Sequence, residues 1–186
     1  MSIEVEIRAK VSGSDEIEKS LEKIGAELVK SERQTDKIFG AAKFLDSEHK
    51  IIEGGVSARI REVDGKSKLE FKEILREKGG IELSCLIPSI KVGEKMLKKL
   101  DFEEAFTIKK GRKVYSYNDF TICLDEVEKL GNFIEIEKEI NTEGEIEKTR
   151  NECIGLLEKI APGSKIENRK YGDLMQELVN QMSRDK

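Results

Sequence analysis

Charged residues occupy alternate positions of several strand-like segments in this 186-residue chain, and they recur as pairs of like charge. Because successive side chains of a β-strand point to opposite faces, two residues separated by one position lie on the same face. Each pair therefore presents two like charges side by side. The four pairs are Glu4 and Glu6, Arg59 and Arg61, Lys110 and Arg112, and Glu135 and Glu137.

These residue types fit the binding of a phosphate chain together with a divalent cation. Mg²⁺ and Mn²⁺ prefer oxygen ligands and commonly bind carboxylates together with substrate phosphates. An arginine fork donates two N–H groups to phosphate oxygens, and a lysine adds a point charge. Alternating charges also occur on solvated sheet faces, where ion pairs contribute little energy. Their recurrence as like-charged pairs in four segments favours a binding site.

The faces that carry these pairs contain further charged residues of both signs. If the sheet closes with these faces inward, they line a polar lumen in which carboxylates and cations lie close together. The acids on these faces are Glu4, Glu6, Glu70, Glu82, Asp125, Glu135 and Glu137, and the bases are Arg8, Lys10, Arg59, Arg61, Lys72, Lys110 and Arg112.

Hydrophobic periodicity predicts an α+β fold in which helices accompany an antiparallel sheet. The Asp64-Gly65 dipeptide predicts a tight hairpin turn. Met96, Leu97 and Leu100 are expected to face inward from their helix. Strands are predicted over residues 3–11, 57–63, 68–74, 81–87, 107–117, 120–125 and 133–140, with a short extended segment over 31–39. Helices are predicted over about residues 14–29, 92–100, 142–160 and 169–182.

Composition narrows the class of protein. Charged residues make up 39% of the chain with a net charge of −4, and the isoelectric point is near 5.4, so there is no overall positive field for nucleic acid. Three cysteines without a Cys-x-x-Cys pair and a single histidine, His49, argue against a disulfide framework or a zinc site and favour a reducing cytosol. No segment resembles a signal peptide or a membrane span. We expect one cytoplasmic domain over residues 1–186 that can form a homodimer and that binds neither nucleic acid nor membrane.

Several segments, in order along the chain, resemble the CYTH superfamily of triphosphate tunnel metalloenzymes. Residues 4–8 are similar to the family's Glu-x-Glu-x-Lys signature, with Arg8 in place of the lysine. Residues 58–61 resemble its Leu-Arg-Ile-Arg strand. The longest match, residues 124–137, resembles Leu-Asp-x-Val-x-x-Leu-Gly-x-Phe-x-Glu-Ile-Glu.

The resemblance implies a closed, eight-stranded antiparallel β-barrel with helices packed outside and a triphosphate bound in its tunnel. It implies catalytic roles for Glu4, Glu6, Arg8 and Asp125. The residues implied to ligate Mg²⁺ or Mn²⁺ are Glu4, Glu6, Glu135 and Glu137, with Asp125 in support. Those implied to bind phosphate are Arg8, Lys10, Arg59, Arg61, Lys72, Lys110 and Arg112.

The resemblance leaves two reactions open, because the family includes class IV adenylyl cyclases and thiamine triphosphatases. A cyclase would convert ATP to cyclic AMP and pyrophosphate. A triphosphatase would hydrolyse tripolyphosphate, thiamine triphosphate or a nucleoside triphosphate, and fold alone does not choose between the two. A non-catalytic polyphosphate or nucleotide sensor would need the bases without the carboxylates. Since both Glu-x-Glu pairs are present, we rank the enzymes above the sensor.

Overall fold

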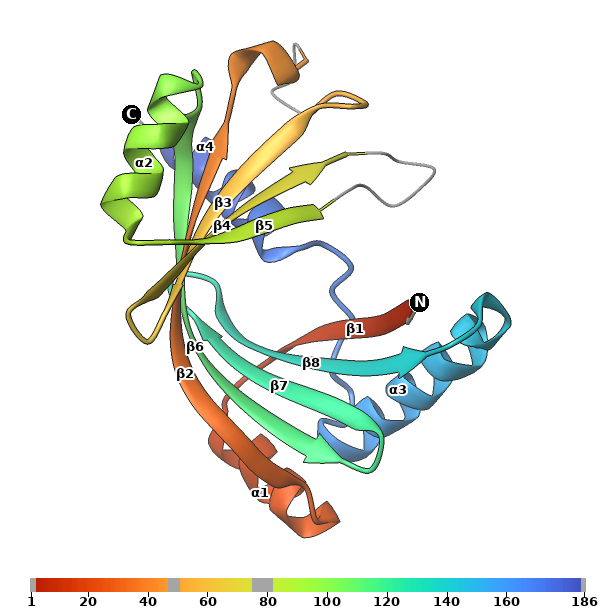
Figure 1. Cartoon of the computed structure of the whole chain (residues 1–186). Coiled ribbons are helices and arrows are strands. Elements are labelled where there is room, and N and C mark those ends of the chain that lie inside the picture. The colour runs from red at the N-terminus through yellow and green to blue at the C-terminus, as the bar shows by residue number, and fades with distance from the viewer. Residues whose placement is uncertain (1–2, 47–50, 75–81, 185–186) are drawn as a thin grey trace. The chain divides into compact units, whose positions relative to one another are not determined.

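The computed structural model describes residues 3–46, 51–74 and 82–184. Its centre is an eight-stranded antiparallel sheet in the order β1-β8-β7-β6-β2-β3-β4-β5 (Figure 1). The strands are β1 (Ile3–Val11), β2 (Glu27–Gly40), β3 (Val56–Val63), β4 (Lys66–Glu73), β5 (Glu82–Ile87), β6 (Glu103–Tyr117), β7 (Phe120–Val127) and β8 (Gly131–Ile140). The α-helices are α1 (Asp15–Ile24), α2 (Ile90–Lys99), α3 (Ile146–Ile160) and α4 (Tyr171–Arg184), and the 3-10 turns are η1 (Ala42–Phe44) and η2 (Glu143–Glu145).

The α+β class and the eight antiparallel strands confirm the prediction from sequence. Strands β1 and β5 are the two ends of the strand order, and within the described residues they do not pair with each other. Closure into a barrel therefore stays a prediction.

The chain divides into two compact units. The first comprises Met1–Glu32 and Lys110–Lys170, and the second comprises Arg33–Lys109 and Tyr171–Lys186. Strands β2 and β6 each have residues in both units. The single domain expected over residues 1–186 stays a prediction, and the two units are described separately below.

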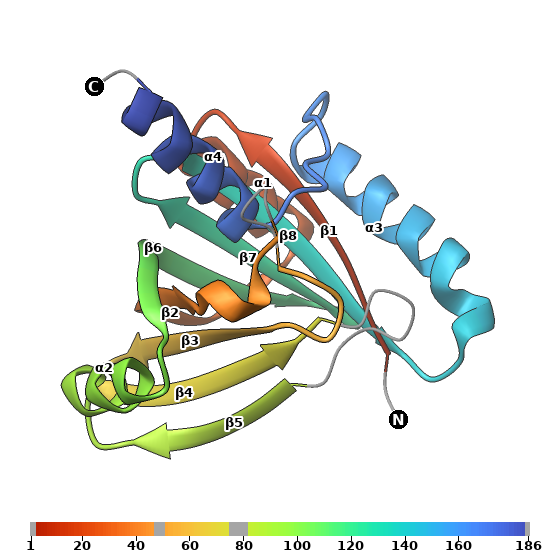
Figure 2. The same ribbon diagram turned by 90° about the horizontal axis from the view of Figure 1, so that it is seen from above.

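The core of the first unit lies between the sheet and helices α1 and α3. Alternation along β1 directs Ile7 and Ala9 to one face, where they join Leu156 and Ile160 of α3 and Leu21 of α1. Helix α3 runs alongside β1 in both views (Figures 1 and 2). Burying one such aliphatic side chain stabilises the fold by about 1.5–3 kcal/mol. The opposite face of β1 is therefore left to its charged residues.

The core of the second unit is smaller and forms under helix α2. Ile60 of β3, Leu69 of β4 and Leu97 of α2 belong to the same buried cluster. A Cβ at Gly93 would lie 2.8 Å from Cδ1 of Ile60, so this glycine allows the helix to approach the sheet closely. The side chain of Leu97 is fully buried.

The predicted inward face of α2 was wrong at two positions. Met96 is 50% exposed and Leu100 is 54% exposed. Residues 96, 97 and 100 span more than a quarter of the helix circumference. The buried face of α2 is formed by Gly93 and Leu97, which lie about 40° apart around the helix axis, whereas Met96 lies about 100° from Leu97 and Leu100 follows the helix end at Lys99.

The helix predicted to end near Val29 ends at Ile24, because Gly25 adopts a left-handed conformation with φ of 82° and donates its N–H to the carbonyl of Glu22. Leu28 and Val29, expected in that helix, are exposed residues of β2. The extended segment predicted over 31–39 is consequently the second half of a strand of 14 residues.

Other boundaries differ by a few residues. Strand β6 begins at Glu103, four residues before the predicted start. Thr142 precedes the η2 turn, so α3 begins only at Ile146. The hairpin turn is confirmed, since Asp64 and Gly65 both have positive φ. His49 and residues 75–81, including the predicted start of β5, lie outside the described residues.

No helix in the described ranges combines the length and apolar character that a membrane span requires.

Candidate active site

The register of the first unit brings charged residues of four strands onto one face. Strand β8 lies between β1 and β7, and it pairs Glu137 with Glu6 and Glu135 with Arg8. On the far side, β6 pairs with β7. Asp125 of β7 is thereby directly opposite Arg112 of β6.

Asp125 is the centre of this face. Its carboxylate is fully buried and accepts hydrogen bonds from Nε and Nη2 of Arg112 at 2.7 and 2.6 Å. Nζ of Lys110 donates to the same carboxylate at 3.1 Å. Two cations are thus held on one acid. A bidentate contact of this kind fixes the plane of a guanidinium group.

Burial and charge act against each other in this group. Burial by itself would raise the pKa of Asp125, but hydrogen bonds from Arg112 and the charge of Lys110 hold it below its usual range. Burial lowers the pKa of Lys110, and the carboxylate of Asp125 only partly offsets that effect. The pKa of Arg112 is raised, because its bond to Asp125 and the charge of Glu135 outweigh burial. Asp125 therefore stays ionised at neutral pH.

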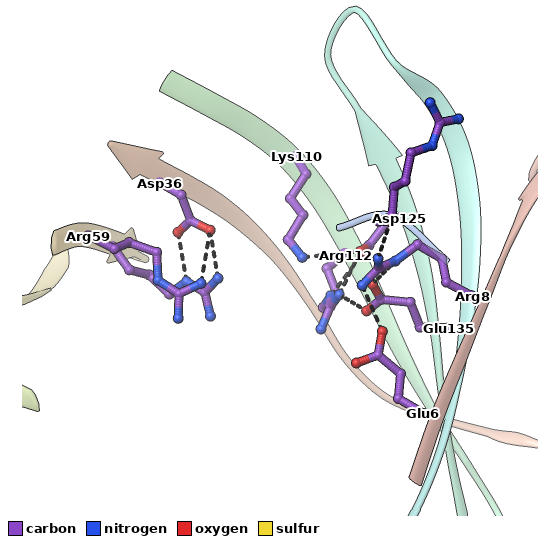
Figure 3. Close-up of polar contacts among 10 residues, drawn as sticks. Glu6, Arg8, Asp36, Arg59, Lys110, Arg112, Asp125 and Glu135 are labelled. Atoms are coloured by element: carbon purple, nitrogen blue, oxygen red, sulfur yellow. Dashed lines mark hydrogen bonds and ion pairs between the residues drawn. The ribbon is translucent and has the colours of Figure 1, made fainter. Parts of the chain in front are cut away.

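A continuous chain of ion pairs leads from Asp125 to β1 (Figure 3). Arg112 also donates to Glu135. The other oxygen of Glu135 accepts from Nε of Arg8 at 2.6 Å, and Nη2 of Arg8 contacts Glu6 at 2.7 Å. Nη1 of Arg8 donates to the backbone carbonyl of Arg169 at 2.9 Å. Strands β1 and β8 and the segment before α4 therefore hold Arg8 in place.

Three carboxylates form a second feature of this face, which we call the carboxylate trio: Glu4, Glu6 and Glu137. One oxygen from each lies within 4.8 Å of the others. Burial and the charges of Glu4 and Glu135 raise the pKa of Glu137 to about 7. Burial and the charge of Glu135 also raise the pKa of Glu6, against the effect of Arg8. A bound cation would reduce the repulsion between these carboxylates. Three hard oxygen donors suit Mg²⁺ or Mn²⁺.

The trio contains three of the four residues implied to ligate a metal. Glu135, the fourth, lies beside them on β8, but both of its oxygens accept hydrogen bonds from arginine. Its place in the structure is between Arg8 and Arg112, where it links the trio to Asp125.

The second unit has its own cluster of ion pairs, on β2, β3 and β4. Asp36 of β2 receives Nε and Nη2 of Arg61 at 2.7 and 2.6 Å. Nη1 of Arg59 lies 3.9 Å from the same carboxylate, while its Nε donates to Glu70. Nζ of Lys68 lies 3.1 Å from Glu70. Both arginines keep part of their surface exposed, with side-chain exposures of 32% and 27%.

The acids of this cluster are more buried than its cations. Burial would raise the pKa of Glu70, but the hydrogen bond and charge of Arg59 lower it. Glu82 of β5 lies at the edge of the cluster, 3.8 Å from Nη2 of Arg59. Asp36 and Glu70 thus orient cations whose outer atoms remain accessible to an anion.

Two predicted phosphate ligands lie apart from these ion pairs. Nζ of Lys10 is 5.8 Å from the centre of the Phe133 ring. Lys72 of β4 is paired in register with Glu82 and Ser57. Among the described residues, neither lysine forms an ion pair, so both ammonium groups are available to a ligand.

Sequence reasoning missed three residues of these clusters. Asp36 lies in the short extended segment predicted over residues 31–39 but was not chosen as a site residue. Lys68 stands two residues before Glu70, and therefore on the same face of its strand, but it was omitted from the bases. Cys123 was considered only for cysteine pairing, although it stands two residues before Asp125 and therefore on the same face. That spacing was the available signal.

The chain is similar to known proteins in sequence and in fold. A Methanocaldococcus jannaschii protein named "Putative adenylate cyclase" is 31% identical over 161 residues, which cover 85% of this chain and 89% of the relative. A solved Pyrococcus horikoshii protein has a TM-score of 0.70 and 27% identity, covering 91% of this chain and 97% of its own.

A third match shows the fold alone. It is a Hippeastrum protein with a TM-score of 0.67 and 18% identity, covering 95% of this chain and 96% of its own. It is described as a "putative adenylyl cyclase" that reveals a dominant triphosphatase activity. The family model of the CYTH domain matches residues 2–170. This match spans nearly the whole chain, and the chain belongs to the CYTH domain family.

Proposed function

We propose that the chain is a metal-dependent enzyme that acts on a triphosphate, and that it converts ATP to cyclic AMP and pyrophosphate. The observation that carries the proposal is the position of Arg8, Lys110 and Arg112 beside the carboxylate trio on one sheet face. A triphosphate needs cations along its oxygens and a divalent ion to neutralise its charge. This face supplies residues for both.

Arg112 is the best oriented of the phosphate ligands. It uses Nε and Nη2 to bind carboxylates, and Nη1 points to no partner among the described residues. A guanidinium group fixed in this way loses little conformational freedom when it binds an anion. Asp125 and Glu135 are positioning residues in this proposal, because they orient the arginine without contacting substrate.

The carboxylate trio would hold Mg²⁺ or Mn²⁺. When bound, such an ion supplies positive charge that stabilises the phosphate oxygens as the P–O bond breaks. The residues of the chain contribute the remaining positive charge. Arg8 contacts Glu6 of the trio, and Glu135 links Arg8 to Arg112. The two arginines therefore form a row of positive charge that begins at the trio.

The name of the M. jannaschii relative favours cyclisation. In that reaction the ribose 3′-oxygen forms a bond to the α-phosphorus, its proton is lost, and the bond from the α-phosphorus to the bridging oxygen of pyrophosphate breaks. The description of the Hippeastrum protein favours a second candidate, a triphosphatase, in which water attacks a terminal phosphorus. Both reactions would use the same cations and the same trio.

The tunnel form of the fold is part of the proposal. The two terminal strands of the order, β1 and β5, must come together for the sheet to close. In this proposal the arginine cluster around Asp36 also binds phosphate. Its partly exposed guanidinium groups, oriented by Asp36 and Glu70, support that role.

Product analysis tests the function. Purified protein is incubated with Mg²⁺ or Mn²⁺ and, separately, with ATP, thiamine triphosphate or tripolyphosphate, and cyclic AMP, pyrophosphate and phosphate are resolved. Equimolar cyclic AMP and pyrophosphate from ATP support the cyclase. Phosphate from tripolyphosphate without cyclic AMP replaces the cyclase with the triphosphatase. Tight triphosphate binding without turnover of any substrate would contradict the proposal that the chain is an enzyme and would favour a sensor.

A further inference from the structure

Cys123 is a buried cysteine that lies outside the hydrophobic core. Its side chain is 2% exposed, yet the core cluster of the first unit includes Cys153 and not Cys123. The register places Cys123 of β7 opposite Glu135 of β8. Among the described residues, its thiol has no hydrogen-bond partner. A buried thiol on a charged face is unusual, because cysteine usually packs as a small apolar side chain.

The thiol and two carboxylates form a group of potential metal ligands. Sγ of Cys123 and one oxygen each of Glu135 and Glu137 all lie within 4.8 Å of one another. In a tetrahedral zinc site, the ligand atoms are roughly 3.5 Å apart. Rotations of two glutamate side chains can close that difference. The oxygens of Glu135 already accept hydrogen bonds, but a carboxylate oxygen has a second lone pair.

We propose that Cys123, Glu135 and Glu137 bind a thiophilic divalent cation, Zn²⁺ or Cd²⁺. On binding, the thiol proton passes to solvent and the thiolate sulfur forms a bond to the metal, so three negative ligands surround a doubly charged ion. The positive charges of Arg8 and Arg112, which contact Glu135, repel a bound cation. The negative charges of Glu6 and Asp125, which pair with these arginines, reduce that repulsion. A thiolate selects zinc and cadmium over magnesium.

This site and the carboxylate trio share Glu137. A thiophilic ion that holds Glu137 removes it from the trio and therefore inhibits turnover that depends on Mg²⁺. This consequence rests on the proposed function, whereas the binding of the ion does not. Sequence reasoning had considered cysteines only in pairs, so a mixed site with one cysteine was not expected.

Cadmium titration tests the binding directly, because a Cd²⁺–thiolate bond gives a charge-transfer absorption. We expect the absorption to saturate at one equivalent in the wild-type protein and in Cys85→Ser and Cys153→Ser, which alter an exposed and a core cysteine. Cys123→Ser should lose the absorption and bind Cd²⁺ at least about tenfold more weakly. Absorption that persists in Cys123→Ser, or that depends on Cys85, would overturn the site.

Two further measurements keep the proposal testable if Cys123→Ser does not fold. X-ray absorption of the Zn²⁺ complex of Cys85→Ser should show one sulfur neighbour at about 2.3 Å and oxygen neighbours at about 2.0–2.2 Å. Oxygen neighbours alone would contradict the site. Glu4→Gln alters the trio but not this site, so it should keep the Cd²⁺ absorption. In the wild-type protein, Cd²⁺ absorption together with absent Mg²⁺-dependent turnover would mean that the proposed function fails while the thiolate site holds.

Discussion

Replacing Asp125 by asparagine should destabilise the protein strongly, because it removes the negative charge that two buried cations share. The side chains of Lys110 and Arg112 are only 5% and 16% exposed. Breaking a buried ion pair from one side costs about 3–5 kcal/mol. Asparagine still offers one acceptor oxygen, so the lower end, about 3 kcal/mol, applies. For a chain of this length that free energy lowers Tm by about 6–12 °C.

Thermal unfolding of Asp125→Asn and Asp119→Asn gives the comparison. Asp119 also pairs with a lysine, Lys138, but its side chain is 61% exposed. An exposed pair contributes at most about 1 kcal/mol, so Asp119→Asn should lower Tm by no more than about 4 °C. Equal changes in the two variants would refute the argument from burial.

Two additional arms test the charge argument. Lys110→Met in the Asp125→Asn background removes one buried cation that has lost the charge of Asp125, and it should restore part of the lost Tm. The second arm uses pH. The pKa of Asp125 is lowered in the folded state, so its stabilisation is complete above the unfolded value of about 3.9 and is lost as pH falls through the lowered pKa. The Tm difference between wild type and Asp125→Asn should therefore shrink in acid.

Three other outcomes are expected. The pKa of Glu137 is raised to about 7, so the Tm of the metal-free protein should fall as pH rises from about 4.5 to 7.5. Glu137→Gln or saturating Mn²⁺ should make this dependence of Tm on pH weaker, and an equally steep dependence in Glu137→Gln would contradict the assignment. Arg59→Ala should weaken tripolyphosphate binding about tenfold or more by calorimetry while Tm changes little, and unchanged affinity with a large loss of Tm would assign Arg59 to folding alone. Leu97→Ala should cost about 2–5 kcal/mol and Met96→Ala less than about 0.5 in thermal unfolding, and similar costs would show that α2 packs differently.

Much of the candidate site could be predicted because its signal is local. Strand alternation requires no tertiary information, so Glu4 and Glu6 or Lys110 and Arg112 were assigned to common faces from spacing alone. The register between strands, by contrast, depends on side-chain packing and on turns. Sequence spacing therefore could not show that Glu135 lies between Arg8 and Arg112 while Glu137 joins Glu4 and Glu6.

The fold was least predictable where a strand lacks a buried face. The first residues of β2, Glu27 to Ser31, are all exposed, so no alternation of apolar and polar residues marked them as a strand. The preceding helix was extended through them because Leu28 continues its apolar spacing. Gly25 was the local signal for the helix end, since a left-handed residue commonly terminates a helix.

Manganese binding by electron paramagnetic resonance tests the central claim most directly. Wild-type protein and Glu4→Gln/Glu6→Gln are titrated with Mn²⁺ in the presence and absence of tripolyphosphate, and turnover is measured in the same samples. We expect the wild type to bind Mn²⁺ without substrate, and the double variant to lose that binding and its turnover while its affinity for tripolyphosphate falls only modestly. Unchanged Mn²⁺ binding and turnover in the double variant would contradict the assignment of the carboxylate trio as the metal site.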